Sequence, residues 1–321
     1  MDGSSLSQSI IGLFLLCFPL GLSGQQLFRI NQAHQQMGTQ WKIVLYHQDT
    51  VAGHQIMESA FKRLDQLNSI FSDYDLASEL SQLSSKAESK EWIRVSEDLF
   101  DILVLAKKYA KKSKGAFDPT VGPLSKLWRR AFRRQVFPDW PKIVAAQTNV
   151  NYRKLGIKRP HFIRLKSDKM QLDLGGIAKG WAVDDLARLL VAQGVTSFLI
   201  DGGGDIKVGE APPHQTGWTI RLPDSSYQVL ENQAIATSGA QYRFLIDDGK
   251  KYSHIINPTT GIGIDGTETV TVIAKSCVVA DVSATIISIL KANSRPSFIR
   301  KERNIHQLII QKYEEKKFYQ K

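Results

Sequence analysis

The chain has 321 residues, of which 42% are hydrophobic and 23% are charged, an ordinary globular composition for one large domain or two modest ones. The net charge of +11 would suit nucleic acid, but no nucleic-acid recognition motif is present, so an anionic membrane surface or a phosphorylated small molecule is the better expectation. Cys277 is the single cysteine beyond the first 24 residues, which excludes an internal disulfide and a cysteine-based metal site there.

The N-terminal segment contains a nearly unbroken apolar run at residues 10–22, followed by small residues. This run is too short for a comfortable transmembrane helix and is typical of a secretory signal peptide. Asp2 and the absence of Lys or Arg before the run are atypical, so residues 1–24 are predicted to be a signal peptide or a retained N-terminal anchor. Both alternatives predict an exported protein, periplasmic or membrane-associated and facing the periplasm, with residues 25–321 as its functional domain.

Hydrophobic periodicity predicts strands and helices in the first half of the chain. We expect a strand at 41–46, a helix at 55–67, a strand at 92–95 and a helix from Ser96 to about Ser113. Ser96 is the expected helix cap, and Gly115 ends the helix. Residues 122–157 are basic, aromatic and proline-containing, and they are predicted to form a helical excursion from the main sheet.

The second half of the chain carries most of the expected strands. We expect helices at 178–193 and 280–290 and strands at 162–165, 170–174, 197–200, 218–222, 233–236, 243–246, 269–274 and near 307–310. Runs of strands with interspersed helices favour an α+β fold over a regular βαβ alternation. The predicted core is therefore a mixed or antiparallel β-sheet flanked by helices, with a smaller helical excursion.

One segment, residues 172–184, has the features of a phosphate-binding junction. A short apolar strand carrying Asp173 ends at Gly175 and Gly176 and leads through Lys179 into an amphipathic helix. Glycines let the backbone approach an anion, and a helix start offers unpaired N–H groups and a positive dipole end. An ordinary strand–turn–helix junction remains the alternative for the glycines alone.

A second pair of residues has the chemistry of a metal site. Asp281 and Thr285 are four residues apart on a predicted helix, so they share a face. A carboxylate and a hydroxyl are hard oxygen ligands that suit Mg²⁺. The alternative is that Asp281 caps the helix and Thr285 packs.

Three further segments offer ligand-binding or catalytic groups. His254 precedes the turn sequence Pro-Thr-Thr-Gly and is either a general acid–base or a hydrogen-bonded structural residue. Tyr74 follows a helix and either stacks on a ring system or packs. The stretch at 115–124, with two prolines and two glycines, fixes an extended backbone whose amides and carbonyls can meet a planar ligand.

Taken together and in order, these segments resemble one family, the ApbE-type flavin transferases, which are FAD:protein FMN transferases. The matching pieces are Met37-Gly38-Thr39, Ser72-Asp73-Tyr74 with Ser78-Glu79-Leu80, residues 117–124, residues 172–184, Gly203-Gly204-Asp205-Ile206, Thr237-Ser238-Gly239, residues 254–261, and Ala280-Asp281 with Thr285. The match covers roughly residues 37–290. Each piece is weak alone, whereas the ordered series is strong evidence.

The resemblance implies a sandwich-like α+β domain with roles at the matching positions. The implied FAD contacts are Met37, Tyr74, Ala116, Phe117, Asp118, Asp173, Lys179 and Ile256. The implied Mg²⁺ ligands are the carbonyl of Gly176, Asp281 and Thr285, and His254 is the histidine implicated in catalysis. Trp181 stands where the family usually has Tyr, and Asn257 replaces the usual Asp, a change that affects the turn more than the chemistry.

The implied reaction is metal-assisted transfer of FMN from FAD to a threonine or serine hydroxyl of an exported flavoprotein of a membrane redox complex, with release of AMP. His254 would take the proton of the attacking hydroxyl, with Asp281 as the alternative base. Two other functions stay open at this point: FAD pyrophosphatase activity yielding FMN and AMP, and non-catalytic FAD binding as an accessory protein of a redox complex.

Overall fold

The computed structural model describes residues 26–239, 244–265 and 267–312. The segment expected to be a signal peptide or anchor, residues 1–24, lies outside the described residues. Within the described ranges, the search for a helix of the length and hydropathy that a membrane span requires finds none.

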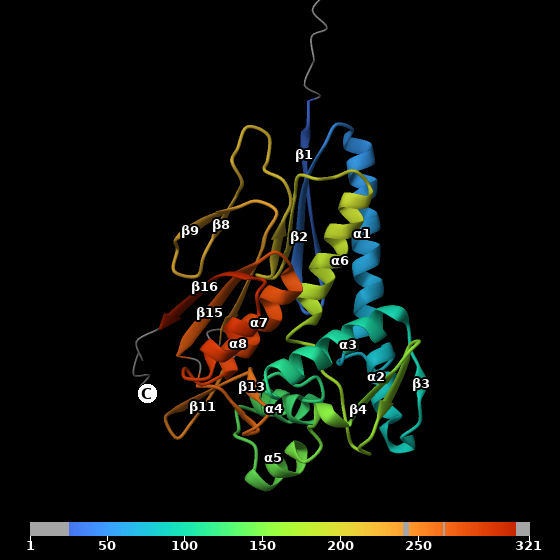
Figure 1. Cartoon of the computed structure of the whole chain (residues 1–321), viewed down its shortest axis with the longest axis vertical. Coiled ribbons are helices and arrows are strands. Elements are labelled where there is room, and N and C mark those ends of the chain that lie inside the picture. The colour runs from blue at the N-terminus through green and yellow to red at the C-terminus, as the bar shows by residue number, and fades with distance from the viewer. Residues whose placement is uncertain (1–25, 240–243, 266, 313–321) are drawn as a thin grey trace, which may run out of the picture.

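The centre of the protein is a seven-stranded sheet in which all neighbouring strands are antiparallel (Figure 1). In spatial order the strands are β1 (Phe28–Gln36), β2 (Thr39–His47), β6 (Phe198–Gly202), β7 (Ile206–Val208), β10 (Ala234–Gly239), β15 (Glu268–Ala274) and β16 (Ile305–Lys312). Side chains alternate between the faces of β2, where Trp41 and Ile43 enter the main core and Val44 enters a smaller core behind the sheet. The predicted α+β fold is confirmed.

Three long helices cover one face of the sheet (Figure 1). They are α1 (Thr50–Phe71), α6 (Ala178–Ala192) and α7 (Cys277–Ile289). The predicted first helix is longer than expected because Asp49 caps it, accepting a hydrogen bond from the N–H of Val51 at 2.8 Å. The helix expected from residue 280 begins three residues earlier, so Asp281 lies in its second turn.

A group of shorter elements adjoins the end of α1. It consists of α2 (Glu79–Ser85), a 3₁₀ turn (Ala87–Ser89), α3 (Glu97–Lys112) and a small sheet of β3 (Ile93–Arg94), β5 (Phe162–Leu165) and β4 (Leu155–Lys158). Ser96 caps α3 as predicted, accepting from the N–H of Leu99 at 3.2 Å. Glu79 in turn accepts a hydrogen bond from the Ser96 hydroxyl, which ties α2 to α3.

The helical excursion lies at one end of the molecule, at the bottom of Figure 1. It contains α4 (Gly122–Arg134), α5 (Trp140–Gln147) and a 3₁₀ turn (Tyr152–Lys154), and it packs on the hairpins β11 (Phe244–Asp247) with β12 (Lys250–Ser253) and β13 (Ile256–Asn257) with β14 (Ile262–Gly263). Trp128 is fully buried there and donates a hydrogen bond to the carbonyl of Gly261 at 2.8 Å. The excursion thus supports the segment that carries His254.

Two peripheral elements complete the fold. The hairpin of β8 (Trp218–Arg221) and β9 (Tyr227–Leu230) covers the second core behind the sheet. The helix α8 (Arg295–Lys301) follows α7 and places Phe298 in the main core.

One predicted strand is wrong. Residues 170–174 form no strand; a single parallel bridge joins Gln171 to Val121. The N–H of Leu172 donates to the Ser84 hydroxyl and that of Asp173 to the carbonyl of Pro119, so no ladder forms. The edge strand β1 was not predicted, because it buries Ile30 alone and lacks a clear apolar alternation.

Candidate active site

The helix α6 begins directly after the predicted glycine turn. Ile177 stands at the cap position and makes no side-chain capping bond, so other parts of the chain meet the first N–H groups. Asp281 of α7 provides one partner, accepting at Oδ2 from the N–H of Gly180 at 3.0 Å. A methyl group on Gly180 would lie 2.7 Å from the carbonyl oxygen of Cys277, so this glycine permits the close approach of α6 and α7.

A lysine and two carboxylates are buried together at this contact. Lys179 forms an ion pair with Asp205, which follows the turn between β6 and β7. Burial acts to lower the pKa of Lys179, but attraction to Asp205 and Asp281 outweighs burial, so this pKa is raised. Burial, followed by repulsion from Asp205, raises the pKa of Asp281 to about 7. The carboxyl groups of Asp205 and Asp281 share the single ammonium group of Lys179, and this arrangement favours binding of a further cation.

The expected metal ligands are neighbours in the structure. A Cβ on Gly176 would lie 3.4 Å from Oγ1 and 3.1 Å from Cγ2 of Thr285, so the glycine backbone reaches the Thr285 side chain. Asp281 lies one turn before Thr285 on α7. Phe117 borders the same point, because its Cε2 would be 3.4 Å from that Cβ. The structure therefore brings Gly176, Asp281 and Thr285 together beside one predicted FAD contact.

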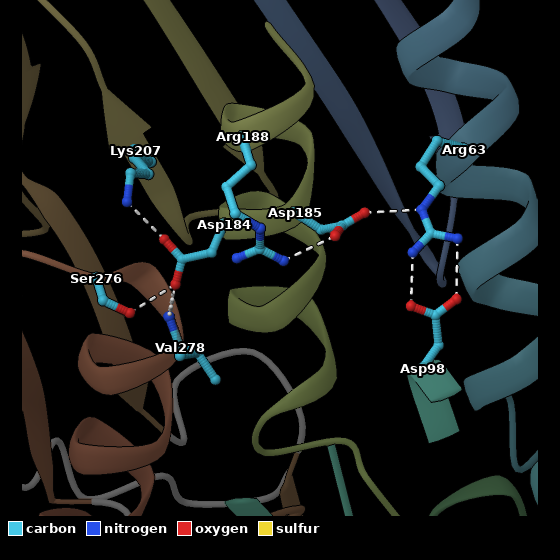
Figure 2. A network of polar contacts seen from close by, with 8 residues as sticks. All are labelled: Arg63, Asp98, Asp184, Asp185, Arg188, Lys207, Ser276 and Val278. Atoms are coloured by element: carbon cyan, nitrogen blue, oxygen red, sulfur yellow. Dashed lines mark hydrogen bonds and ion pairs between the residues drawn. The ribbon is translucent and has the colours of Figure 1, made fainter. Parts of the chain in front are cut away.

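A separate carboxylate holds the start of α7 in place (Figure 2). Asp184 of α6 accepts hydrogen bonds from the N–H of Cys277 at 3.0 Å, the N–H of Val278 at 2.9 Å and the hydroxyl of Ser276 at 2.6 Å. Lys207 of β7 is its ion-pair partner at 2.7 Å. Asp281 of α7 caps α6, and Asp184 of α6 caps α7. Each helix thus accepts hydrogen bonds from backbone N–H groups at the start of the other.

A second network fixes α6 against α1 and α3 (Figure 2). The guanidinium of Arg63 contacts Asp98 at 2.6 Å and Asp185 at 2.8 Å, and Arg188 contacts Asp185 at 2.7 Å. This paired Arg–carboxylate geometry locks α6 and hence the position of Lys179.

Tyr74 and Asp173, both predicted FAD contacts, are linked by Arg129 of α4. The Arg129 guanidinium lies 3.9 Å from the centroid of the Tyr74 ring and contacts Asp173 at 3.1 Å and Asp73 at 2.5 Å. Burial, followed by repulsion from Asp173, raises the pKa of Asp73 to about 6. Asp173 also accepts from the N–H of Gly175 at 2.7 Å, which ties this cluster to the glycine turn.

The predicted contacts at 116–118 lie in a buried loop after α3. Ala116 and Phe117 are both buried. The two carboxylate oxygens of Asp118 accept hydrogen bonds within the loop region, from the N–H and hydroxyl of Thr120 and from the N–H of Tyr152. In this structure Asp118 shapes the loop that presents Phe117.

His254 lies between β12 and β13, and Ile256 is the first residue of β13. His254 is exposed just after β12, and Ile256 is buried in a cluster with Trp128 and other side chains of α4 and α5. The predicted turn is confirmed, because Asn257 accepts from the N–H of Thr259 at 2.9 Å. Ile256 therefore packs against the excursion, and His254 stands two residues before it at the surface.

Met37 lies in the hairpin turn between β1 and β2, with a positive φ of 49°. A Cβ on Gly203 would lie 2.3 Å from the hydroxyl of Thr39, so this turn abuts the Gly203–Gly204 turn before Asp205. The β1–β2 turn that carries Met37 therefore lies beside the turn before Asp205.

Sequence reasoning missed three residues of this region. Asp205 was recognised as part of a motif but given no role, although a carboxylate directly after three glycines was an available signal. Asp73 was likewise part of a quoted motif without a role, and Arg129 carried no local signal, because its carboxylate partners lie more than 40 residues away.

Comparisons with known proteins place this fold and site in one family. The model of the ApbE family matches residues 37–309. A FAD:protein FMN transferase of Treponema pallidum is 30% identical over 308 residues, covering 87% of this chain and 84% of the relative, and one of Vibrio cholerae is 32% identical over 270 residues, covering 79% of each. The crystal structure of the apbe protein from Thermotoga maritima aligns with a TM-score of 0.79 at 25% identity, covering 90% of this chain and 97% of that one. The structure of the flavin transferase ApbE from Vibrio cholerae aligns with a TM-score of 0.77 at 28% identity, covering 89% of this chain and 93% of that one.

These findings define the class of the protein as a transferase enzyme. The chain belongs to the ApbE family.

Proposed function

We propose that this protein transfers FMN from FAD to a threonine or serine hydroxyl of an acceptor protein, with Mg²⁺ as the metal ion and AMP as the leaving product. The observation that carries the proposal is the meeting of Gly176, Asp281 and Thr285 at the start of α6, beside Lys179. The names of the relatives, FAD:protein FMN transferases, agree with it.

The residues at this point fit a magnesium ion. Among the residues that the structure describes, no group of three or more His, Cys, Asp or Glu side chains could hold a metal. A site of one carboxylate, one hydroxyl and one carbonyl suits Mg²⁺, which takes few protein ligands and leaves positions for phosphate and water. Mg²⁺ bound there would neutralise negative charge on the pyrophosphate of FAD.

The remaining roles belong to side chains of this chain. Lys179, held by Asp205, adds a positive charge at the helix start, where N–H groups favour the pyrophosphate. The acceptor oxygen forms a bond to the FMN-side phosphorus while the anhydride bond to AMP breaks, so the chain mainly has to align the two groups. His254 takes the proton of the attacking hydroxyl. It is exposed and therefore accessible to a protein substrate, whereas Asp281 is buried.

We also propose that the protein is exported and acts in the periplasm or on the membrane facing it, on a flavoprotein of a membrane redox complex. The apolar run at residues 10–22 supports export. The net charge of +11 supports association with an anionic membrane surface. Fractionation of cells that express the full chain tests this location, and recovery in the cytosol alone would refute it.

The direct test combines the purified protein, FAD, Mg²⁺ and a threonine-containing exported flavoprotein subunit from the same organism. Mass spectrometry should show the acceptor with one added FMN and an equal amount of AMP. Asp281→Asn should give almost no adduct within the time of the wild-type reaction, and the exposed Asp168→Asn serves as the matched control.

A parallel reaction without acceptor separates the two enzymatic alternatives. Release of FMN and AMP at the same rate with and without acceptor, and no adduct, would mean that the protein is a FAD pyrophosphatase. FAD recovered intact together with an unmodified acceptor would refute the transferase proposal.

A further inference from the structure

A single arginine joins the two predicted flavin contacts that come from distant parts of the chain. Tyr74 lies in the loop between α1 and α2, and Asp173 lies before α6. Arg129 of α4 reaches both, with its guanidinium 3.9 Å from the Tyr74 ring centroid and 3.1 Å from Asp173. Three separate elements therefore meet at this guanidinium.

The arrangement leaves the Tyr74 ring accessible to a planar ligand. The Tyr74 residue is 67% exposed although a guanidinium already lies over its ring. A guanidinium stacks flat on an aromatic ring, so it occupies one face and holds the ring in a fixed orientation. The opposite face is then the one that a flavin ring can use.

The two carboxylates around Arg129 hold it in this position. Asp73 and Asp173 contact different nitrogen atoms of the guanidinium, at 2.5 Å and 3.1 Å, and both side chains are largely buried. Two anchored contacts set the plane of the guanidinium, which a single ammonium group cannot reproduce. A simple surface ion pair would need only one exposed carboxylate, whereas Arg129 has two that are largely buried.

We propose that Arg129 is a positioning residue that orients the Tyr74 ring, and through it the isoalloxazine ring of FAD. This inference rests on the proposed function, because it takes FAD as the ligand. It adds a residue that the sequence did not identify and assigns a task to the basic helix α4. Arg129 acts through Tyr74 and makes no bond to the reacting phosphorus.

The test compares Arg129→Lys and Arg129→Ala with Arg130→Ala, an exposed arginine at the next position of the same helix. Titration with FAD should give binding about tenfold weaker for Arg129→Lys, the size expected of one partly desolvated cation–π contact, and at least as weak for Arg129→Ala. At saturating FAD, the bound flavin of both variants should show less quenched fluorescence than in the wild type. Arg130→Ala should match the wild type.

A double-mutant cycle with Tyr74→Ala shows whether Arg129 acts through the ring. In the Tyr74→Ala background, Arg129→Lys should cause almost no further loss of FAD affinity, because the contact to be positioned is gone. Tyr74→Phe, which keeps the ring, should retain the dependence on Arg129.

Three results would overturn this inference. The first is wild-type FAD affinity in Arg129→Lys. The second is weaker binding with an unchanged spectrum of the bound flavin and a lowered melting temperature, which would make Arg129 a structural link alone. The third is additive losses in the cycle. Failure of the wild type itself to bind FAD would instead refute the proposed function.

Discussion

Two buried aspartates at the contact of α6 and α7 have similar positions and different surroundings. Asp184 accepts hydrogen bonds from three donors at the start of α7 and pairs with Lys207. Asp281 accepts one hydrogen bond, from Gly180, and faces Asp205 as well as Lys179. A carboxylate with a full set of partners stabilises the fold, whereas an under-partnered one retains capacity for a ligand.

The largest expected effect is on activity at Asp281. We expect Asp281→Asn to slow FMN transfer roughly a thousandfold, because loss of the proposed metal ligand would remove several kcal/mol of transition-state stabilisation. The melting temperature should stay equal or rise, since a buried carboxylate with a raised pKa is removed. Initial rates and calorimetric Mg²⁺ titration measure the two effects. Transfer at the wild-type rate would refute the assignment of Asp281 to the active site.

The reverse pattern is expected at Asp184. Replacement by Asn leaves Lys207 without its ion-pair partner and weakens the bonds to Ser276 and Val278, so the free energy of unfolding should fall by about 3 kcal/mol. Folded Asp184→Asn protein at low temperature should keep its transfer rate within a few fold. Denaturant unfolding measures stability, with Asp168→Asn as the exposed control. An unchanged denaturant midpoint in Asp184→Asn would contradict the structural role that separates Asp184 from Asp281.

A smaller loss of stability is expected at Lys179. Lys179→Gln leaves the buried Asp205 without its cation, which should cost roughly 2 kcal/mol of unfolding free energy. Adding Asp205→Asn should recover part of that loss, because the uncompensated charge disappears. Unfolding of the single and double variants gives the coupling. Strictly additive losses would show that the two side chains do not act as a pair.

An effect no larger than that at Lys179, and confined to a pH window, is expected at Asp73. Its pKa is about 6 in the folded protein and near 3.8 when unfolded, so the unfolded state releases its proton first as pH rises. This carboxyl should therefore lower stability by roughly 2 kcal/mol between pH 4 and pH 6. Asp73→Asn should flatten melting temperature against pH across that window. An equal slope in both proteins would contradict the assignment.

The sequence predicted those parts of the site that depend on local spacing. Helical periodicity placed Asp281 and Thr285 on one face, and the glycines before Lys179 marked the start of α6. Turn chemistry predicted the bend that Asn257 makes. These features need a few neighbouring residues and no knowledge of the fold.

The remaining features depend on the order of the strands and the packing of distant elements. Asp205 reaches Lys179 because the β6–β7 turn lies at the start of α6, and no local pattern contains that information. The cluster of Arg129, Tyr74 and Asp173 joins three elements, so no local pattern contains it either. Residues 170–174 look like a strand by composition, but side-chain and loop partners take their N–H groups.

The reciprocal capping of α6 and α7 has a consequence for the order of events in biosynthesis. Gly180 and Asp281 are separated by 101 residues, so the start of α6 gains this partner after nearly the whole domain has been synthesised. Long-range contacts of this kind form late because their loops are costly to close. The emerging polypeptide therefore lacks the finished contact between α6 and α7 until α7 docks. The proposed binding of FAD at this contact thus requires a chain that has completed folding.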